Sequence, residues 1–343
     1  PQDHLRHLMA SLFFLSPAKS ATHRRIDWVA ALAIALALAI YGFVSSDLGL
    51  LDTLGTVFMY IVLTQAWNIL GGYGGYLNFG MVTYFGIGAY TTALIYQYFQ
   101  VSPLVSAPLA AIAGAVVGLL IGIPTLRLRG AYFAVVTMII TSAIQIAVLA
   151  VSFTQGALGI YLPQLELSPR GSEQLFYFIF LGLAAATTGL VYAIEHSNFG
   201  WALVAIREDE DAAEVVGVKT TEIKWTANAL AAFLTGLIGG IYAQRVFYIE
   251  PTSTFTLDTS LNVVLMAVIG GVASWQGPLI GSAVVLLVAQ WLRVTVTSEA
   301  SRVIFSLVVI LIALYVPRGV MGVITQARRR AALAAAPAAA ANE

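Results

Sequence analysis

Cysteine is absent from the 343 residues, and charged residues make up only 10% of them. Without cysteine the chain can form no disulfide, no thiolate metal site and no thiol nucleophile. Lysine occurs only as Lys19, Lys219 and Lys224, and none of these follows a glycine. The Gly-x-x-x-x-Gly-Lys-Ser/Thr loop that cradles ATP phosphates is therefore missing. The formal net charge is zero, so nothing suggests binding to nucleic acid.

Hydrophobic residues, in contrast, make up 59% of the chain, and the mean hydropathy is +0.86. They fall in blocks of about 20 residues, long enough to cross about 30 Å of hydrocarbon. The sequence therefore predicts an all-α polytopic membrane protein with about ten transmembrane helices. The expected spans are 28–44, 54–70, 77–98, 104–123, 131–152, 174–194, 226–247, 260–273, 278–294 and 302–316.

Lysine and arginine predict the orientation of these spans, because basic residues collect on the cytoplasmic side of a membrane protein. With the N-terminus in the cytoplasm, 13 of the 17 basic residues fall in inside segments. The other four lie outside or near the outer interface: Arg170, Arg245, Arg293 and Arg302. Both termini and the loop at about 195–224 are therefore expected to be cytoplasmic.

Three regions follow from this topology. They are a cytoplasmic N-terminal segment 1–27, a transmembrane domain 28–322 and a cytoplasmic tail 323–343. The tail is rich in alanine and has no apolar face to bury, which predicts that it is disordered.

One dense group of charges interrupts the hydrophobic pattern. Residues 207–217 read Arg-Glu-Asp-Glu-Asp-Ala-Ala-Glu-Val-Val-Gly, and six of the first eight are charged. We expect a short helix over 209–216, because acidic residues crowd its first turn, where they favour the positive end of the helix dipole. Gly217 suits the position just past the C-terminus.

The same segment has features that favour a docking surface. Asp211 and Glu214 have capping-box spacing. Ala212 and Ala213 are small enough for another surface to approach the backbone closely. A helix this short is marginal in water, so we expect packing to hold it, with a partner as one source of that packing. A solvated loop helix is the ordinary alternative for such a run of charges.

The sequence offers little support for catalysis or for a proton-driven carrier. The four histidines show no metal-binding spacing inside a pocket, and no Ser/His/Asp set falls together. No ionisable group lies at the centre of an expected span, where it would indicate a functional site. Glu195, Arg245 and Arg293 lie near span ends, where they can snorkel to the interface. Energy is therefore expected to come from an external source.

Four motifs and a closing motif resemble a known family. Asp211-Ala-Ala-Glu-Val-Val-Gly217 resembles the Glu-Ala-Ala-x-x-x-Gly coupling loop of ABC importer permeases, with Asp in place of Glu. The longer run Ala205–Gly217 is similar to branched-chain amino acid permeases of the LivH/LivM type. Further stretches agree: Trp67-Asn-Ile-Leu-Gly-Gly-Tyr-Gly-Gly-Tyr-Leu-Asn-Phe-Gly80 with Gly86-Ile-Gly-Ala-Tyr90, Gly122-Ile-Pro-Thr-Leu-Arg-Leu-Arg-Gly-Ala-Tyr132, Val268-Ile-Gly-Gly-Val-Ala-Ser-Trp-Gln-Gly-Pro-Leu-Ile-Gly281 and Tyr315-Val-Pro-Arg-Gly319.

The resemblance covers about residues 50–322 and points to the LivM-like subunit. It implies the membrane-spanning, non-enzymatic subunit of an ATP-binding cassette importer in the bacterial cytoplasmic (inner) membrane. This subunit would form the path for branched-chain or related amino acids delivered by a periplasmic or extracellular solute-binding protein. ATP and magnesium would bind in a separate ATPase, present in one or two copies, and a LivH-like permease would complete the assembly.

The resemblance also implies roles for particular residues. Those that couple to the ATPase are Arg207, Glu208, Asp209, Asp211, Ala212, Ala213, Glu214 and Gly217. A broken, Gly-rich helix region is expected to line the translocation path, with close helix packing through small residues as the alternative. Its residues are Gly71, Gly72, Tyr73, Gly75, Tyr76 and Asn78.

An outer loop is the expected gate or binding-protein contact, through Thr154, Gln155, Gly156 and Gly159. It reads Thr-Gln-Gly-Ala-Leu-Gly-Ile where relatives more often read Thr-Gly-Gly-x-x-Gly-Ile, which leaves substrate identity open. An importer of urea or a short amide is the alternative within the class. A stand-alone channel or secondary carrier is the alternative outside it, although neither needs a coupling helix. A membrane enzyme would lack a catalytic constellation.

Overall fold

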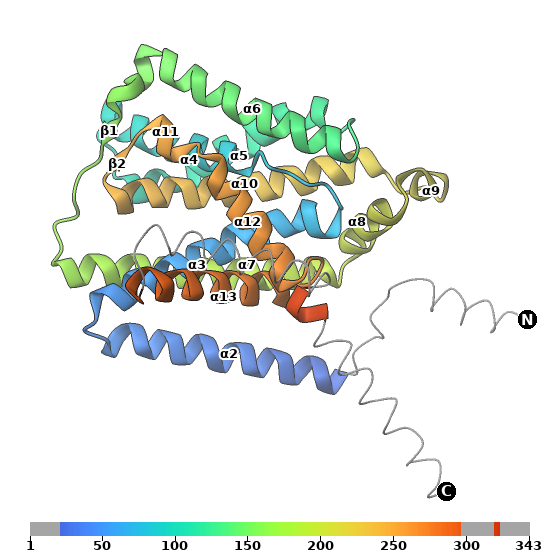
Figure 1. Cartoon of the computed structure of the whole chain (residues 1–343), viewed down its shortest axis with the longest axis horizontal. Coiled ribbons are helices and arrows are strands. Elements are labelled where there is room, and N and C mark those ends of the chain that lie inside the picture. Colours follow the sequence, from blue (N-terminus) through green and yellow to red (C-terminus); the bar gives the residue numbers. More distant parts are fainter. Residues whose placement is uncertain (1–20, 296–318, 323–343) are drawn as a thin grey trace, which may run out of the picture. The chain divides into compact units, whose positions relative to one another are not determined.

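The computed structural model describes residues 21–295 and 319–322. The chain divides into two compact units, 1–47 and 48–343. The described part of the first unit is the helix α2 (Ala21–Val44). The described part of the second unit is a bundle of helices with one small sheet (Figure 1).

The elements of the second unit follow in chain order. The helices are α3 (Leu48–Asn68), α4 (Met81–Phe99), α5 (Pro103–Thr125), α6 (Ala131–Ala150), α7 (Pro169–Glu195), α8 (Asn198–Glu208), α9 (Glu210–Val215), α10 (Thr220–Val246), α11 (Pro251–Thr254), α12 (Leu257–Gly270) and α13 (Gln276–Thr295). A π-helical turn η1 (Ile69–Tyr73) extends α3, and two short 3-10 turns, η2 (Ser152–Thr154) and η3 (Gly156–Leu158), follow α6. The strands β1 (Ile160–Tyr161) and β2 (Tyr248–Ile249) pair antiparallel.

Seven helices among the described residues are long and apolar enough to cross a membrane. This confirms the polytopic helical class. Nine of the ten predicted spans overlap a helix, and the tenth, 302–316, lies outside the described residues. The number ten therefore stays a prediction. The tail 323–343 and most of the segment 1–27 also lie outside the described residues, although α2 already begins at Ala21 rather than at 28.

Many exposed side chains of the helices are apolar, as expected for contact with lipid. Along α6, Val135, Ile139 and Ile146 are all more than half exposed. Contiguous exposed apolar surface of this kind is unusual for a soluble monomer and suits contact with hydrocarbon. Polar side chains instead turn inward and bond between helices: Asn228 Nδ2 of α10 donates to Gly118 O of α5 at 2.6 Å. Such bonds satisfy polar groups that lipid would leave unpaired.

Helix α10 forms the centre of the bundle and packs mainly against α5 and α4. Glycines permit this approach. A Cβ on Gly88 of α4 would lie 2.1 Å from Gly236 O of α10, and one on Gly239 would lie 2.0 Å from Phe85 O. The two helices therefore meet backbone against backbone, as small-residue interfaces allow.

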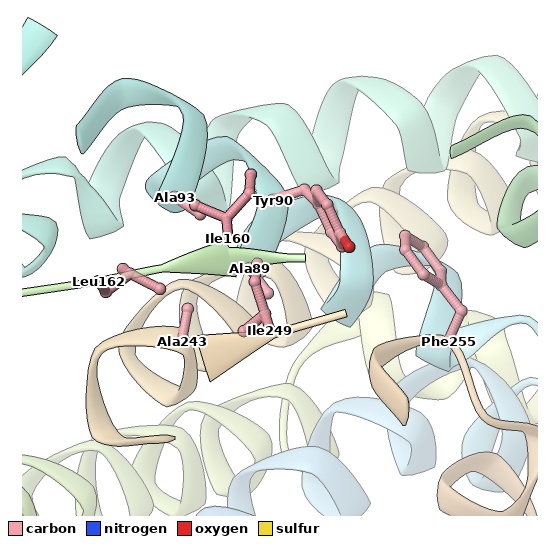
Figure 2. Close-up of a cluster of buried hydrophobic side chains, with 8 residues drawn as sticks. All are labelled: Ala89, Tyr90, Ala93, Ile160, Leu162, Ala243, Ile249 and Phe255. Carbon is pink, nitrogen blue, oxygen red and sulfur yellow. The ribbon is translucent and has the colours of Figure 1, made fainter. Parts of the chain in front are cut away.

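The two ends of α10 meet different structures. Its N-terminal end follows α9, and its C-terminal end leads into β2, so α9 and the sheet lie at opposite ends of this bundle (Figure 1). Around the sheet, side chains from α4, α10, the strands and the turn after α11 form a buried apolar cluster (Figure 2). Its members are Ala89, Tyr90, Ala93, Ile160, Leu162, Ala243, Ile249 and Phe255.

The close approach of α4 and α10 gives a prediction about stability. Gly88→Ala places a methyl group against the Gly236 carbonyl, so we expect a loss of about 1–3 kcal/mol through overpacking. Gly182→Ala in α7 is the matched control, because no atom lies within 4 Å of its added Cβ. That change should raise stability by up to about 1 kcal/mol through helix propensity. Thermal unfolding of both variants in detergent measures this, and equal melting temperatures would contradict the proposed close contact.

Candidate functional site: the α9 loop and its anchors

The charged segment folds as a short helix between two longer ones. Asp209 has extended backbone angles and separates α8 from α9. Its side chain accepts a hydrogen bond from Ala212 N at 3.0 Å, which caps the N-terminus of α9. The predicted helix 209–216 is therefore confirmed with Asp209 as its cap, and the helical residues run from Glu210 to Val215.

The C-terminus of α9 also follows the prediction. Gly217 has a positive φ of 91°, a backbone conformation that glycine adopts without strain. Gly217 N donates to Glu214 O at 2.9 Å, and Val218 N donates to Ala213 O at 3.0 Å. These two bonds form a Schellman motif, which satisfies carbonyls that the helix end would leave unpaired.

The predicted capping box between Asp211 and Glu214 is wrong. Asp209 takes the capping position, so both predicted partners are free for contacts outside α9. Glu214 accepts a hydrogen bond from the Thr220 hydroxyl at 2.6 Å. Asp211 forms a two-pronged pair with Arg129, at 2.7 and 3.0 Å. Each side chain thus ties α9 to a different segment.

Glu210 provides the deepest anchor of α9. Its side chain is 10% exposed and forms an ion pair with Lys224, whose side chain is 6% exposed. The Tyr76 hydroxyl donates to the other carboxylate oxygen of Glu210 at 2.7 Å. Lys224 also donates to Leu126 O at 3.0 Å, so its charge has partners on three segments. A buried charge needs such partners, because removal from water otherwise costs several kcal/mol.

These contacts shift the acidity of the loop carboxyls. Burial opposes the ionisation of Glu210, but hydrogen bonds from Lys224 and Tyr76 outweigh it and hold its pKa below the usual value. Hydrogen bonds from the Arg129 guanidinium likewise lower the pKa of Asp211. Both groups are therefore charged at neutral pH.

Helix α8 contacts the same region of the bundle. Arg207 Nη1 donates to Gly72 O at 3.2 Å, and its other nitrogens pair with Glu208. A Cβ on Gly75 would meet the Arg207 side chain at 2.5 Å, so the two backbones lie close together. The charged loop is thus bonded to residues 72–76, which the sequence analysis had assigned to a separate site.

The C-terminal end of α9 exposes apolar side chains. Val215 is 87% exposed and Val216 is 78% exposed, and Ala212 is exposed between the charged groups. Ala213, the other small residue of the motif, is buried against the bundle. The two valines beside the charged anchors form a small apolar surface that no described residue covers.

The predicted break in the helices is present between α3 and α4. The chain passes from η1 into a non-helical segment, 74–80, before α4 begins at Met81 rather than at 77. Trp67 Nε1 donates to Asn78 O at 2.8 Å, and Phe79 N donates to the Thr137 hydroxyl at 3.3 Å. Protein groups therefore replace the hydrogen bonds that a helix would make.

Most predicted path residues are buried in this conformation. Gly71, Gly72, Tyr73, Tyr76 and Asn78 are buried, and only Gly75 is exposed. None of them lines the cavity of about 430 Å³ between α3, α10, α12 and α13.

Two of these buried side chains hold neighbouring segments together. The Tyr73 hydroxyl donates to Glu195 at 2.7 Å, and the same carboxylate accepts from Trp275 N at 2.9 Å. Asn78 Nδ2 donates to Asn228 Oδ1 of α10 at 3.4 Å. The break is closed by protein contacts rather than open to water.

The predicted outer loop lies at the other end of the bundle from α9. The Thr154 hydroxyl bonds Val148 O and Val151 O, which folds the chain back at the end of α6. Gln155, Gly156 and Gly159 all have positive φ angles. Gln155 thus adopts a left-handed conformation at the position where relatives more often have glycine. The loop exposes Leu158, which is 80% accessible, before β1 begins.

Sequence analysis missed several residues of these sites. Glu210, Lys224 and Arg129 were not singled out, because their partners lie 14 to 148 residues away in the chain. Arg245 was expected to snorkel, but its side chain is 9% exposed and pairs with Asp52. Short-range patterns carry no signal for such pairs.

The sequence of this chain matches a known family of membrane proteins. A family model described as branched-chain amino acid transport system / permease component matches residues 49–314. The chain belongs to this family. The match covers the bundle that carries the α9 loop, the helix break and the outer loop. No solved structure matches the chain.

Curated proteins similar in sequence support this family assignment. The high-affinity branched-chain amino acid transport system permease protein LivM of Salmonella typhimurium is 29% identical, over 93% of this chain and 80% of its own length. The LivM protein of Escherichia coli is 28% identical, over 90% and 78%. A probable LivH permease of Methanocaldococcus jannaschii is 23% identical, over 72% and 83%. The resemblance drawn from sequence motifs is thereby confirmed.

The buried ion pair predicts that exchanging the Glu210 carboxylate for an amide strongly destabilises the protein. Glu210→Gln leaves the Lys224 charge buried without its counter-charge, so we expect a loss of about 3 kcal/mol in the free energy of unfolding. Glu222→Gln is the matched control, because its pair with Lys219 is exposed and should contribute less than about 1 kcal/mol. Thermal unfolding in detergent compares them. The double variant Glu210→Gln/Lys224→Met should recover most of the loss, and equal stability of the two single variants would rule out this anchoring role.

The lowered carboxyl pKa values predict how the loop responds to acid. Ordinary values are 4.5 for Glu210 and 3.8 for Asp211, and both lie lower in the folded loop. The contribution of these contacts is therefore complete above the ordinary values and is lost as pH falls through the lowered ones. An environment-sensitive fluorophore on Val216→Cys, in a chain otherwise free of cysteine, should change signal only below pH 4.5. A transition above pH 4.5 that a label on Leu158→Cys does not share would contradict this.

Proposed function

We propose that this permease is the membrane-spanning subunit of an ATP-binding cassette importer for branched-chain amino acids. The family match over 49–314 supports this most directly, together with the LivM relatives that cover nine-tenths of the chain. An importer of urea or a short amide is not favoured, because the curated LivM and LivH relatives are named for branched-chain amino acids. The proposed role is non-enzymatic.

The α9 loop is the proposed contact for the ATPase. The supporting observation is the combination of an exposed apolar tip at Val215 and Val216 with buried anchors at Glu210 and Lys224. The exposed face can bind a groove on a partner, and the anchors can pass a displacement to the bundle. The other residues proposed to take part are Arg207, Glu208, Asp209, Asp211, Ala212, Ala213, Glu214 and Gly217. ATP and magnesium would bind in the partner.

The remaining parts of the proposal concern topology and partners. We propose about ten spans in a bacterial inner membrane, with both termini and α9 in the cytoplasm and the sheet on the outer side. A LivH-like permease would complete the path, and a solute-binding protein would dock at Thr154, Gln155, Gly156 and Gly159. Opening of the break at Gly71, Gly72, Tyr73, Gly75, Tyr76 and Asn78 would provide the path.

Matched substitutions at the two ends test this assignment. Val216→Asp adds a charge to the apolar tip of α9, and Leu158→Asp adds one to a similarly exposed residue of the outer loop. We expect Val216→Asp to weaken capture of the ATPase subunit by about tenfold or more and to abolish leucine uptake, because the new charge is desolvated at the interface. Leu158→Asp should retain the ATPase and lose the solute-binding protein instead.

The readouts are co-purification of each partner and uptake of radiolabelled leucine into proteoliposomes. Normal ATPase capture and uptake by the Val216→Asp variant would overturn the assignment of α9. Uptake of urea but not leucine by the wild-type importer would overturn the proposed substrate.

A further inference from the structure

A cavity of about 430 Å³ lies between α3, α10, α12 and α13, apart from the helix break and the α9 loop. Its size falls within the range of small-molecule sites in proteins. Lining residues come from all four helices, so the cavity is formed by the tertiary fold and not by one loop. The residues that line it divide into a charged end and an apolar part.

The charged end lies where the helices begin or finish. Asp52 is near the start of α3, Arg245 is near the end of α10, and Arg293 is near the end of α13. Arg245 is 21 residues along α10 from Lys224. The charged end, which we call the mouth of the cavity, therefore lies about 30 Å from the α9 anchor. With α9 in the cytoplasm, as proposed above, the mouth opens toward the outer side, where substrate arrives.

The apolar part lies one or two helical turns deeper along the same helices. Met59 is two turns beyond Asp52, Met266 is one turn beyond Asn262, and Val285 is two turns before Arg293. Leu286 lies beside Val285 on the cavity wall. Flexible methionines and branched aliphatic side chains form a wall suited to an aliphatic group of variable shape.

The charged groups differ in what they already bind. Arg245 donates to the backbone oxygen of Asp52 at 2.9 Å and to one of its carboxylate oxygens, and it also lies over the ring of Phe180. Arg293 has no hydrogen bond or ion pair among the described residues, and neither does the Asn262 carboxamide. The second carboxylate oxygen of Asp52 accepts no hydrogen bond there either.

Ligand groups of opposite charge match these free positions. A guanidinium without a partner beside an apolar wall binds a carboxylate well, because the bond is charge-assisted and two-pronged. The free oxygen of Asp52 can accept from an ammonium. An anion alone would leave the second oxygen of Asp52 without a hydrogen bond, and an apolar molecule would also leave Arg293 without a counter-charge among the described residues.

We propose that this cavity is a receiving site for the zwitterion of an aliphatic α-amino acid. Arg293 and Asn262 bind its carboxylate, Asp52 binds its ammonium, and the side chain lies against Met59, Met266 and Val285. The outward direction of the mouth and the choice of substrate rest on the proposed function. The site lies in this subunit alone, so it adds selectivity after release from the solute-binding protein.

Photo-leucine, which carries a diazirine in its side chain, tests the site in the assembled importer in lipid nanodiscs without the solute-binding protein. We expect light-dependent modification of Met59, Met266 or Leu286, mapped by mass spectrometry. Excess leucine should prevent it. Leucinamide, which lacks the carboxylate, and 4-methylpentanoate, which lacks the ammonium, should compete about tenfold less well or worse, because each loses one charge-assisted contact.

Substitutions test separately which ligand group each charged residue binds. Arg293→Gln should weaken competition by leucine about tenfold or more and leave competition by leucinamide unchanged, since only leucine has the missing partner. Asp52→Asn should weaken competition by leucine and leave competition by 4-methylpentanoate unchanged. The matched controls are Arg170→Gln and Asp258→Asn, which remove charges from the same end of the bundle without lining the cavity. Arg293 forms no hydrogen bond or ion pair among the described residues, so its loss should not impair folding.

The outcomes distinguish this inference from the proposed function. Leucine uptake by the complete importer together with labelling elsewhere, or labelling that Arg293→Gln does not change, would overturn the receiving site alone. Absence of leucine uptake would overturn the proposed function, and the labelling and its competition would still decide whether the cavity binds an aliphatic zwitterion.

Discussion

The ion pair between Glu210 and Lys224 is the interaction on which the arrangement of the α9 loop depends. A six-residue helix has too few internal hydrogen bonds to be stable in water, so its position must come from tertiary contacts. Glu210 and Lys224 supply these contacts from inside the protein, where neither charge can be moved without exposing the other. The exposed valines at the tip are held in place by charges buried beneath them.

This ion pair links α9 directly to α10. Tyr76 bonds the same carboxylate, and Arg207 bonds Gly72 O, so the loop is attached to the helix break and to the π-helical turn that precedes it. Helix α10 is in turn packed backbone to backbone against α4 through Gly88 and Gly239. Under the proposed coupling, a displacement of α9 would therefore be passed both to α10 and to the break. Side-chain slack at a surface loop would otherwise absorb such a displacement.

Local features of this structure could be predicted from the sequence, and distant contacts could not. The helical class, the short helix at 209–216 and its stop at Gly217 depend on composition and on neighbours within one turn. The supposed capping box failed because Asp209, two residues earlier, took the capping position and Arg129 drew Asp211 away. Arg245 was expected to reach the interface because its partner, Asp52, is 193 residues distant. A pattern of hydrophobicity contains no information about such a pair.

The closed break explains why an external energy source suits this chain. Protein groups bond parts of its non-helical backbone, as the bond from Trp67 to Asn78 O illustrates. Opening a path here exchanges those bonds for bonds to water, and each exchange must be compensated. Among the contacts that hold the segment, those of Tyr76 and Gly72 lead to the charged loop. If α9 is the partner contact proposed above, a partner that displaces it would act on the bonds that keep the break closed.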